Sequence, residues 1–235
     1  MEKDKQFVRE IFNDIAPKYD FLNRFLSFGI DRLWRKRLIK ILKRIGFQDA
    51  VILDAATGTA DMAIQLAALN PKKIFGIDIA VNMLKKAQKK IIRRGLQNVI
   101  ELKEADSEHT NFNNEFFDLI TCVFGVRNFE NLDIGLREFN RILKKNGYLA
   151  ILEFSNKRNK SFDLFFKFYF SKILPIIGKK LSNNEIAYYY LPKSVEDFPS
   201  GDDFCRILQK YSFKCILRKK LSFGVVYLYI AIKIQ

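Results

Sequence analysis

Short apolar runs alternate with amphipathic stretches from residue 51 to residue 154. Runs of this length predict strands that are buried on both faces, and they cover 51–55, 73–78, 98–103, 117–123 and 147–154. Apolar residues recur at helical spacing between them, which predicts helices over 60–69, 81–94 and 132–144. The alternation favours a parallel sheet covered by helices on both faces. Asn146-Gly147 predicts a break that starts the last of these strands.

Three segments flank this pattern. Residues 1–46 carry apolar side chains at helical spacing and predict an N-terminal helical cap. Residues 157–199 form an insertion rich in aromatic residues. The C-terminal part predicts a helix over 202–210 and two antiparallel strands over 213–221 and 225–234. We therefore expect residues 1–235 to form one α/β domain, in which 47–156 is the ligand-binding core and 200–235 completes the sheet.

The aromatic insertion admits two interpretations. Its aromatic residues include Phe162, Phe165, Phe166, Phe168, Tyr169, Phe170, Tyr188, Tyr189 and Tyr190. A helix over 162–177 could pack on the sheet or on a partner subunit. It could equally form a lid that closes a hydrophobic pocket and touches a membrane through Lys167, Lys172, Lys179 and Lys180.

Composition and charge restrict the class of protein. With 235 residues and 49% hydrophobic residues, the chain can bury a large core. A net charge of +15 and a pI of about 9.7 would attract nucleic acid or an anionic membrane, although scattered lysines are also typical of a solvated surface. The apolar runs are broken by lysine well short of the roughly 18 residues of a spanning helix, and no N-terminal block resembles a signal peptide.

Cysteine and histidine usage limits the chemistry. Cys122, Cys205 and Cys215 are an odd number without metal-ligand spacing, which argues against a disulfide framework and makes the cytoplasm the default compartment. His109 is the single histidine, which argues against catalytic triads and histidine metal sites, and no metal is expected. We interpret Cys122, in a predicted buried strand, as a small apolar residue rather than a nucleophile.

The first candidate for chemistry is the segment Val51-Ile52-Leu53-Asp54-Ala55-Ala56-Thr57-Gly58-Thr59-Ala60-Asp61. An apolar run that ends in small residues and enters a helix is typical of a nucleotide-binding crossover, although an ordinary capped helix shows it too. Asp78, at the end of the next strand, can accept both hydroxyls of a ribose. The pattern predicts a cofactor that contains adenosine.

Asp61 helps to identify that cofactor. It lies in the first helical turn, where a dinucleotide would place its pyrophosphate, and a carboxylate there would repel the phosphates. The fingerprint G-x-G-x-x-G, aligned from Ala56, has one glycine in place, at Gly58. S-adenosylmethionine carries no phosphate and has two cationic groups, so it tolerates an acidic rim and is favoured over NAD.

Several motifs, in their order and spacing, resemble the quinone-ring C-methyltransferases of menaquinone and ubiquinone biosynthesis. They include Tyr19-Asp20-x-x-Asn23, Asp54-x-Ala56-Thr57-Gly58-Thr59-x-Asp61, Phe124-Gly125-Val126-Arg127-Asn128 and Tyr190-Leu191-Pro192-x-Ser194, and the resemblance covers nearly the whole chain. It implies a class I methyltransferase fold with a Rossmann-like, seven-stranded sheet. It further implies S-adenosylmethionine as methyl donor and a polyprenylated hydroquinone as acceptor, with demethylmenaquinol favoured and the ubiquinone precursor as the alternative.

The resemblance also implies roles for individual residues. Asp78 would bind the ribose, Asp106 with Ser107 would meet the adenine, and Thr57 with Gly58 would line the methionine moiety. Without the family, an alternative interpretation of Asp106 is a turn or capping residue. This chain has Ala60 where the family often has glycine, and Val123 where some members have serine.

The same motifs suggest catalytic candidates. Arg127 would polarise the ring oxygen or stabilise the phenolate, and Asn128 would orient it. Alternatively, Arg127 pairs with a carboxylate such as Asp20 and holds the N-terminal segment. We expect Tyr19, Asp20 and Asn23 to fold over the cofactor. The suggested walls of the pocket are Phe21, Phe124 and the insertion.

Two other classes of function would also suit a basic chain, an RNA methyltransferase and a module that only binds nucleic acid or membrane. A basic RNA methyltransferase that acts on base amino groups usually has Asn/Asp-Pro-Pro-aromatic after the fourth strand, where this chain has Phe124-Gly125-Val126-Arg127-Asn128. A basic binding module would leave Asp54, Asp78 and Asp106 without a task at strand ends. We therefore expect no nucleic acid partner, and leave open a homodimer and peripheral contact with the inner face of the membrane.

Overall fold

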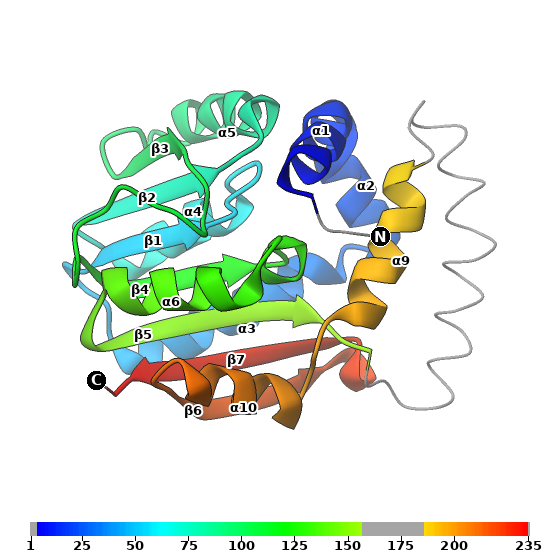
Figure 1. The fold of residues 1–235 in the computed structure, drawn as a ribbon. Helices are drawn as coiled ribbons and strands as arrows, with labels where there is room; N and C mark the ends of the chain where they lie inside the picture. Colours follow the sequence, from blue (N-terminus) through cyan, green and yellow to red (C-terminus); the bar gives the residue numbers. More distant parts are fainter. Residues whose placement is uncertain (1–3, 157–185, 235) are drawn as a thin grey trace.

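Figure 1 shows the protein as a computed structural model, which describes residues 4–156 and 186–234. The helix predicted over 162–177, the aromatic residues Phe162 to Phe170 and the four lysines assigned to membrane contact lie outside these ranges. For the insertion, the structure describes α9 (Ile186–Asp197) and the residues that follow it.

One sheet runs through the described chain. Its strands are β1 (Val51–Ala55), β2 (Lys73–Asp78), β3 (Ile100–Glu104), β4 (Phe117–Val123), β5 (Leu143–Phe154), β6 (Phe213–Leu221) and β7 (Val226–Lys233). The seven strands lie in the order β3-β2-β1-β4-β5-β7-β6, parallel except where β7 pairs with β5 and β6. This arrangement confirms the predicted parallel sheet and its antiparallel end.

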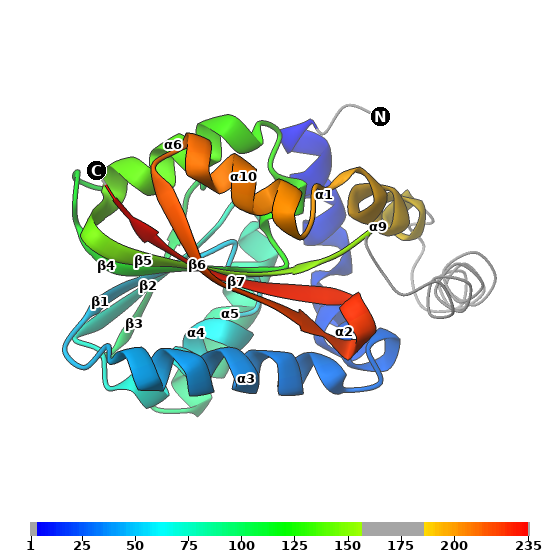
Figure 2. The same ribbon diagram turned by 90° about the horizontal axis from the view of Figure 1, so that it is seen from below.

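Helices cover both faces of the sheet (Figure 2). On one face lie α3 (Ile30–Ile45), α4 (Asp61–Leu66) and α5 (Val81–Arg93), and on the other α6 (Leu132–Ile142) and α10 (Asp202–Lys210). Successive strand residues pack into opposite layers, because side chains alternate across a strand. Ile52 thus joins the core under α3, whereas Leu53 joins the core under α6.

The N-terminal extension divides between two positions. The helices α1 (Lys5–Ile15) and α2 (Tyr19–Leu26) stand at the carboxyl ends of the parallel strands, joined by a single 3₁₀ turn over 16–18. In contrast, α3 packs on the sheet through Trp34, Leu38 and Leu42. The motif Tyr19-Asp20-x-x-Asn23 therefore lies on a helix, within the predicted helical cap.

The start of β5 differs from its prediction by four residues, more than the start or end of any other strand. β5 begins at Leu143, where it pairs with Phe117, and the register then jumps to Leu119 opposite Tyr148. Asn146 has φ 59°, and a Cβ on Gly147 would lie 2.8 Å from the carbonyl oxygen of Lys144. Asn146-Gly147 therefore marks a bulge inside a strand rather than its start, because these two residues tolerate the tight backbone.

A helix that crosses a bilayer needs roughly 20 predominantly apolar residues. Within 4–156 and 186–234, no helix is long and apolar enough to cross a bilayer.

Candidate functional site

The turn between β1 and α4 has an unusual backbone. Ala56, Gly58 and Ala60 have φ values of 51°, 55° and 63°. Side chains in this left-handed region cost roughly 1 kcal/mol each, so the surrounding fold must hold Ala56 and Ala60 there. The Thr57 N–H donates to the carbonyl oxygen of Ile77 at 2.9 Å, which fastens the turn to β2.

Asp78, at the end of β2, closes this turn. Its Oδ2 accepts from the Gly58 N–H at 2.8 Å and its Oδ1 from the Ala80 N–H at 2.9 Å. Burial raises the pKa of Asp78, and the backbone donors oppose that increase. The carboxylate also lines a cavity, so it holds the turn and faces a ligand site at once.

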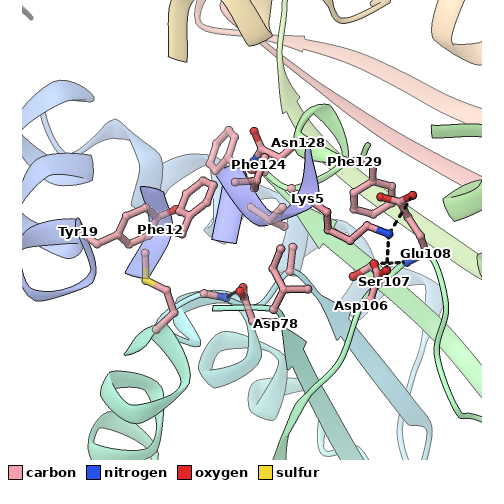
Figure 3. A pocket seen from close by; sticks show the side chains of 17 residues that line it. Lys5, Phe12, Tyr19, Asp78, Asp106, Ser107, Glu108, Phe124, Asn128 and Phe129 are labelled. Atoms are coloured by element: carbon pink, nitrogen blue, oxygen red, sulfur yellow. Dashed lines mark hydrogen bonds and ion pairs between the residues drawn. The ribbon is translucent and has the colours of Figure 1, made fainter. Parts of the chain in front are cut away.

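We call this space the main cavity, and Figure 3 shows the side chains around it. It lies at the carboxyl ends of the parallel strands, where ligands bind in open α/β sheets. Its lining comes from the helices α1, α2 and α5, from the ends of β2 and β4, and from the turns after β1, β2, β3 and β4. The lining residues are Lys5, Val8, Phe12, Tyr19, Ala56, Gly58, Asp78, Ile79, Met83, Asp106, Ser107, Glu108, Val123, Phe124, Gly125, Asn128 and Phe129.

Asp106 and Ser107 lie opposite Asp78 in the main cavity (Figure 3). Lys5 Nζ lies 2.6 Å from Asp106 Oδ2, and the Glu108 N–H donates to Asp106 Oδ1 at 2.9 Å. Burial opposes ionisation of Asp106, but these donors lower its pKa overall. Asp106 therefore stabilises its own turn, as the alternative interpretation expected, and also faces the cavity.

A second, polar cavity adjoins the main one. It is lined by Tyr19, Arg35, Asp54, Ala56, Thr57, Gly58, Thr59, Asp61, Met62 and Val123. Asp54 accepts hydrogen bonds from the hydroxyls of Thr57 and Thr121, both at 2.7 Å. Burial raises the pKa of Asp54 to about 6, so the carboxyl is mostly ionised at neutral pH. Thr57 therefore lies with Asp54 and Asp61, away from Asp106.

Asp20 and Asp61 are joined by a lysine that the sequence argument did not single out. Lys90 Nζ forms ion pairs with Asp61 and, at 3.3 Å, with Asp20 Oδ2. The Thr59 hydroxyl donates to Asp20 Oδ1 at 2.5 Å. Burial by itself would raise the pKa of Asp20, but Thr59, Lys90 and Lys86 outweigh it and leave this pKa lowered. Asp20 thus fastens α2 to the turn after β1, and Asp61 shares Lys90 with it.

Arg127 is placed differently from its prediction. Its Nη1 donates to Glu153 Oε1 and to the carbonyl oxygen of Phe124, both at 2.7 Å, and its side chain is 6% exposed. Arg127 does not line the main cavity, and it pairs with Glu153 rather than with Asp20. The partner named in the alternative interpretation is therefore wrong, although a structural ion pair is present.

Asn128, next to Arg127, does line the main cavity. Its Oδ1 accepts from the Tyr190 hydroxyl at 3.1 Å, and its Nδ2 donates to the carbonyl oxygen of Phe124 at 3.4 Å. Asn128 is thus oriented by α9 and does not itself orient Arg127. Burial raises the pKa of Tyr190.

Tyr19 and Phe21 separate in the structure although they are neighbours in sequence. Tyr19 lines both cavities, and burial raises the pKa of its hydroxyl, which stays protonated at neutral pH. Phe21 is 54% exposed and does not line either cavity, so its prediction as a pocket wall is wrong. Phe124 does form a wall.

Ala60 and Cys122 are two small residues that pack in the core near the turn. Ala60 is fully buried in the core beside α3 and lines neither cavity, so its methyl group does not touch either ligand space. Cys122 is also fully buried, and burial raises the pKa of its thiol well above its usual range. This is the behaviour of the apolar residue that we expected.

Sequence reasoning missed Glu153, Lys90 and Lys5. A signal existed for Glu153, because a single carboxylate in the apolar run 147–154 requires a buried partner. Lys90 and Lys5 gave no such signal. Each lies on an amphipathic helix among other lysines and arginines, and only the packing of that helix selects it.

Comparisons with known proteins agree with this geometry. The model of the ubiE/COQ5 methyltransferase family matches residues 1–233. A demethylmenaquinone methyltransferase of Bacteroides fragilis is 38% identical, over 98% of this chain and 94% of that protein. The ubiquinone/menaquinone biosynthesis C-methyltransferase UbiE of Geotalea daltonii is 41% identical, over 94% of each chain.

Solved structures show the same fold. A SAM-dependent methyltransferase from Aquifex aeolicus superimposes with a TM-score of 0.61 at 18% identity, over 83% of this chain and 88% of that one. The match to the family model spans nearly the whole chain and includes every residue that lines the two cavities. The chain therefore belongs to the ubiE/COQ5 methyltransferase family.

Proposed function

We propose that this protein transfers a methyl group from S-adenosylmethionine to a ring carbon of demethylmenaquinol, which completes menaquinol. The observation that supports this most directly is the composition of the main cavity. Carboxylates that suit an adenosine, Asp78 and Asp106, share it with the apolar walls Phe12, Phe124 and Phe129. The names of the relatives, a demethylmenaquinone methyltransferase and a ubiquinone/menaquinone C-methyltransferase, agree with a quinone substrate.

The residues present suit the cofactor. Asp78 keeps lone pairs free for ribose hydroxyls, and Asp106 with Ser107 would hold the adenine. The tight turn at Gly58, with Thr57 and Asp61 beside it, borders the polar cavity, where the methionine tail would lie. Because Lys5 already holds Asp106, adenine binding requires Lys5 to share that carboxylate or to move with α1.

S-adenosylmethionine supplies an electrophilic methyl group on a sulfonium. The protein's part is to orient the acceptor ring and to exclude water, which favours a reaction that neutralises opposite charges. Tyr19, protonated at neutral pH, can donate a hydrogen bond to a ring oxygen, and Asn128 can do so through its amide. Arg127 and Asp20 would act indirectly, by holding the segments that carry Asn128 and Tyr19 in place.

We propose that residues 1–235 act as one domain, in which each segment has its own role. The cap within 1–46 closes the site through α1 and α2, and 47–156 holds the cofactor. We propose that α9, the described part of the insertion, borders the acceptor through Tyr190, and that 200–234 completes the sheet.

One assay tests the function. Purified protein is incubated with labelled S-adenosylmethionine and, in separate reactions, with demethylmenaquinol, the demethylated ubiquinone precursor or RNA. We expect label in menaquinol. Transfer to the ubiquinone precursor alone would replace the proposed acceptor by the alternative one. Label in RNA alone, or in none of the three, would contradict the proposal.

We further propose that the protein works at the cytoplasmic face of a membrane, because a polyprenylated acceptor resides in the bilayer. Support within the described residues comes from α3. Its exposed face consists of Arg32, Leu33, Lys36, Arg37, Lys40, Lys43 and Arg44. In the part of the chain that the structure describes, no carboxylate pairs with these six cations, so their charge is available to anionic headgroups.

Vesicle binding tests this surface. Changing Arg37, Lys40 and Arg44 to glutamine should weaken sedimentation with phosphatidylglycerol vesicles by about 100-fold, since each basic residue contributes roughly fivefold. A control changes three exposed lysines outside this face, Lys72, Lys145 and Lys210, and lowers the net charge equally. Equal losses in the two variants would show that overall charge, and not α3, is responsible. Gel filtration of the same samples shows whether a homodimer forms.

A further inference from the structure

Arg35 is a buried cation whose hydrogen bonding is incomplete. It lies on α3, its side chain is 6% exposed, and its Nη1 donates to Asp31 Oδ2 at 2.5 Å. The Nε of Arg35 is buried and has no hydrogen-bond partner among the described residues. A buried charged donor without an acceptor costs free energy, and a ligand that supplies an acceptor removes that cost.

The surroundings of Arg35 show where such a ligand would lie. Arg35 lines the polar cavity together with Asp54, Thr57 and Asp61. Arg127 has an unpartnered Nε as well, but it lines neither cavity. Arg35 is therefore the unsatisfied arginine that a bound molecule could reach.

The guanidinium is held in place from two sides. Asp31 binds Nη1, and the Ser27 hydroxyl donates to the other oxygen of Asp31 at 2.9 Å. The ring of Phe124 lies 5.5 Å from Arg35 Cζ, in cation-π contact. Such a fixed, planar donor suits a carboxylate, which can accept two parallel hydrogen bonds from it.

The two cavities are neighbours. Tyr19, Ala56, Gly58 and Val123 line both, so the two cavities adjoin at these residues and one ligand would pass them to occupy both. The main cavity offers acceptors to an adenosine, at Asp78 and Asp106. The polar cavity offers a cation, Arg35, and carboxylates, Asp54 and Asp61, which together complement a group that carries one negative and one positive charge.

We propose that Arg35 binds the α-carboxylate of the methionine moiety of the cofactor, while Asp54 and Asp61 face its ammonium group. This inference rests on the use of S-adenosylmethionine in the proposed function and adds the residue that recognises its amino-acid end. It makes Arg35 a binding residue that selects ligands with the amino-acid tail over adenosine thioethers that lack it.

Two ligands test this inference by calorimetry. S-adenosylhomocysteine carries the α-carboxylate, and 5′-methylthioadenosine lacks the whole amino-acid group. Arg35→Gln should weaken S-adenosylhomocysteine binding by roughly 10- to 30-fold, because a charge-assisted hydrogen bond is lost, and leave methylthioadenosine binding within about twofold. Arg35→Lys should restore part of the loss. Arg32→Gln, on the exposed face of α3, removes the same charge and should change neither affinity.

Three outcomes would overturn the inference. Equal losses for both ligands would mean that Arg35 only supports the fold, and unchanged binding of S-adenosylhomocysteine would mean that its carboxylate lies elsewhere. An equal loss in Arg32→Gln would mean that charge alone matters. If Asp31, left unpaired, unfolds the single variant, Asp31→Asn/Arg35→Gln removes both buried charges and is measured instead. Failure of the unmodified protein to bind either ligand would instead contradict the proposed function.

Discussion

Replacing Arg127 by methionine is expected to lower the free energy of unfolding by about 3–5 kcal/mol, because Glu153 then stays buried and unpaired. Glu153 is fully buried, and its Oε1 accepts from Arg127 Nη1 at 2.7 Å and from the Phe154 N–H at 2.9 Å. The two remaining backbone N–H donors, those of Phe154 and of residue 127 at 3.4 Å, cannot compensate a whole negative charge in the core. Chemical denaturation monitored by circular dichroism measures the change.

Two further variants separate structure from chemistry. Arg127→Met/Glu153→Gln should recover more than half of the loss, since it removes the uncompensated charge. Lys144→Met breaks an ion pair with Asp118 whose side chains are 44% and 33% exposed, and should cost less than about 1 kcal/mol. If Arg127→Met is as stable as this control but turns over far more slowly, Arg127 acts in the reaction itself, as its motif first suggested.

Replacing Asp78 by asparagine is expected to weaken S-adenosylhomocysteine binding by about 100-fold, or roughly 3 kcal/mol. Both carboxylate oxygens of Asp78 accept backbone N–H groups, from Gly58 and Ala80, and an amide nitrogen cannot replace either acceptor. The variant therefore loses the charged acceptor for the ribose and also disturbs the turn that holds the methionine tail. Isothermal titration calorimetry measures the affinity of the unmodified protein and of the variant for S-adenosylhomocysteine.

A matched control lies one strand away. Glu104, at the end of β3, pairs with Arg9 at 2.6 Å, is half exposed and lines neither cavity. Glu104→Gln makes the same change of charge and should leave the affinity unaltered. Binding by Asp78→Asn that matches this control would remove Asp78 from the site and would require another acceptor for the ribose.

The order of elements and the residues at strand ends could be predicted from the sequence. β1, β2, β4 and β6 begin and end at their predicted residues, and Asp78 and Asp106 face one cavity as expected. These predictions succeed because they depend on local patterns. A buried strand needs a continuous apolar run, and a ligand-binding carboxylate in this fold follows such a run.

The partners of charged side chains could not be predicted in the same way. Arg127 pairs with Glu153, and Asp20 pairs with Lys90 across a separation of 70 residues. Each pairing depends on how two distant elements pack, and a chain with 41 basic and 26 acidic residues offers many equally plausible pairs. The motif indicated that Arg127 has a special role, but Glu153 on the neighbouring strand β5 holds its side chain in the core.

The sequence by itself determined the parallel α/β sheet, the turn with its small residues and the carboxylates at strand ends, since each depends on neighbours along the chain. Tertiary structure alone decided which charges face the ligand space and which are buried as pairs. It paired Asp20 with Lys90, bonded the Arg127 guanidinium to the carbonyl oxygen of Phe124, and brought Arg35 to the polar cavity. The physical reason is that a buried charge is stabilised by whatever lies within a few ångströms of it, and packing alone fixes that distance.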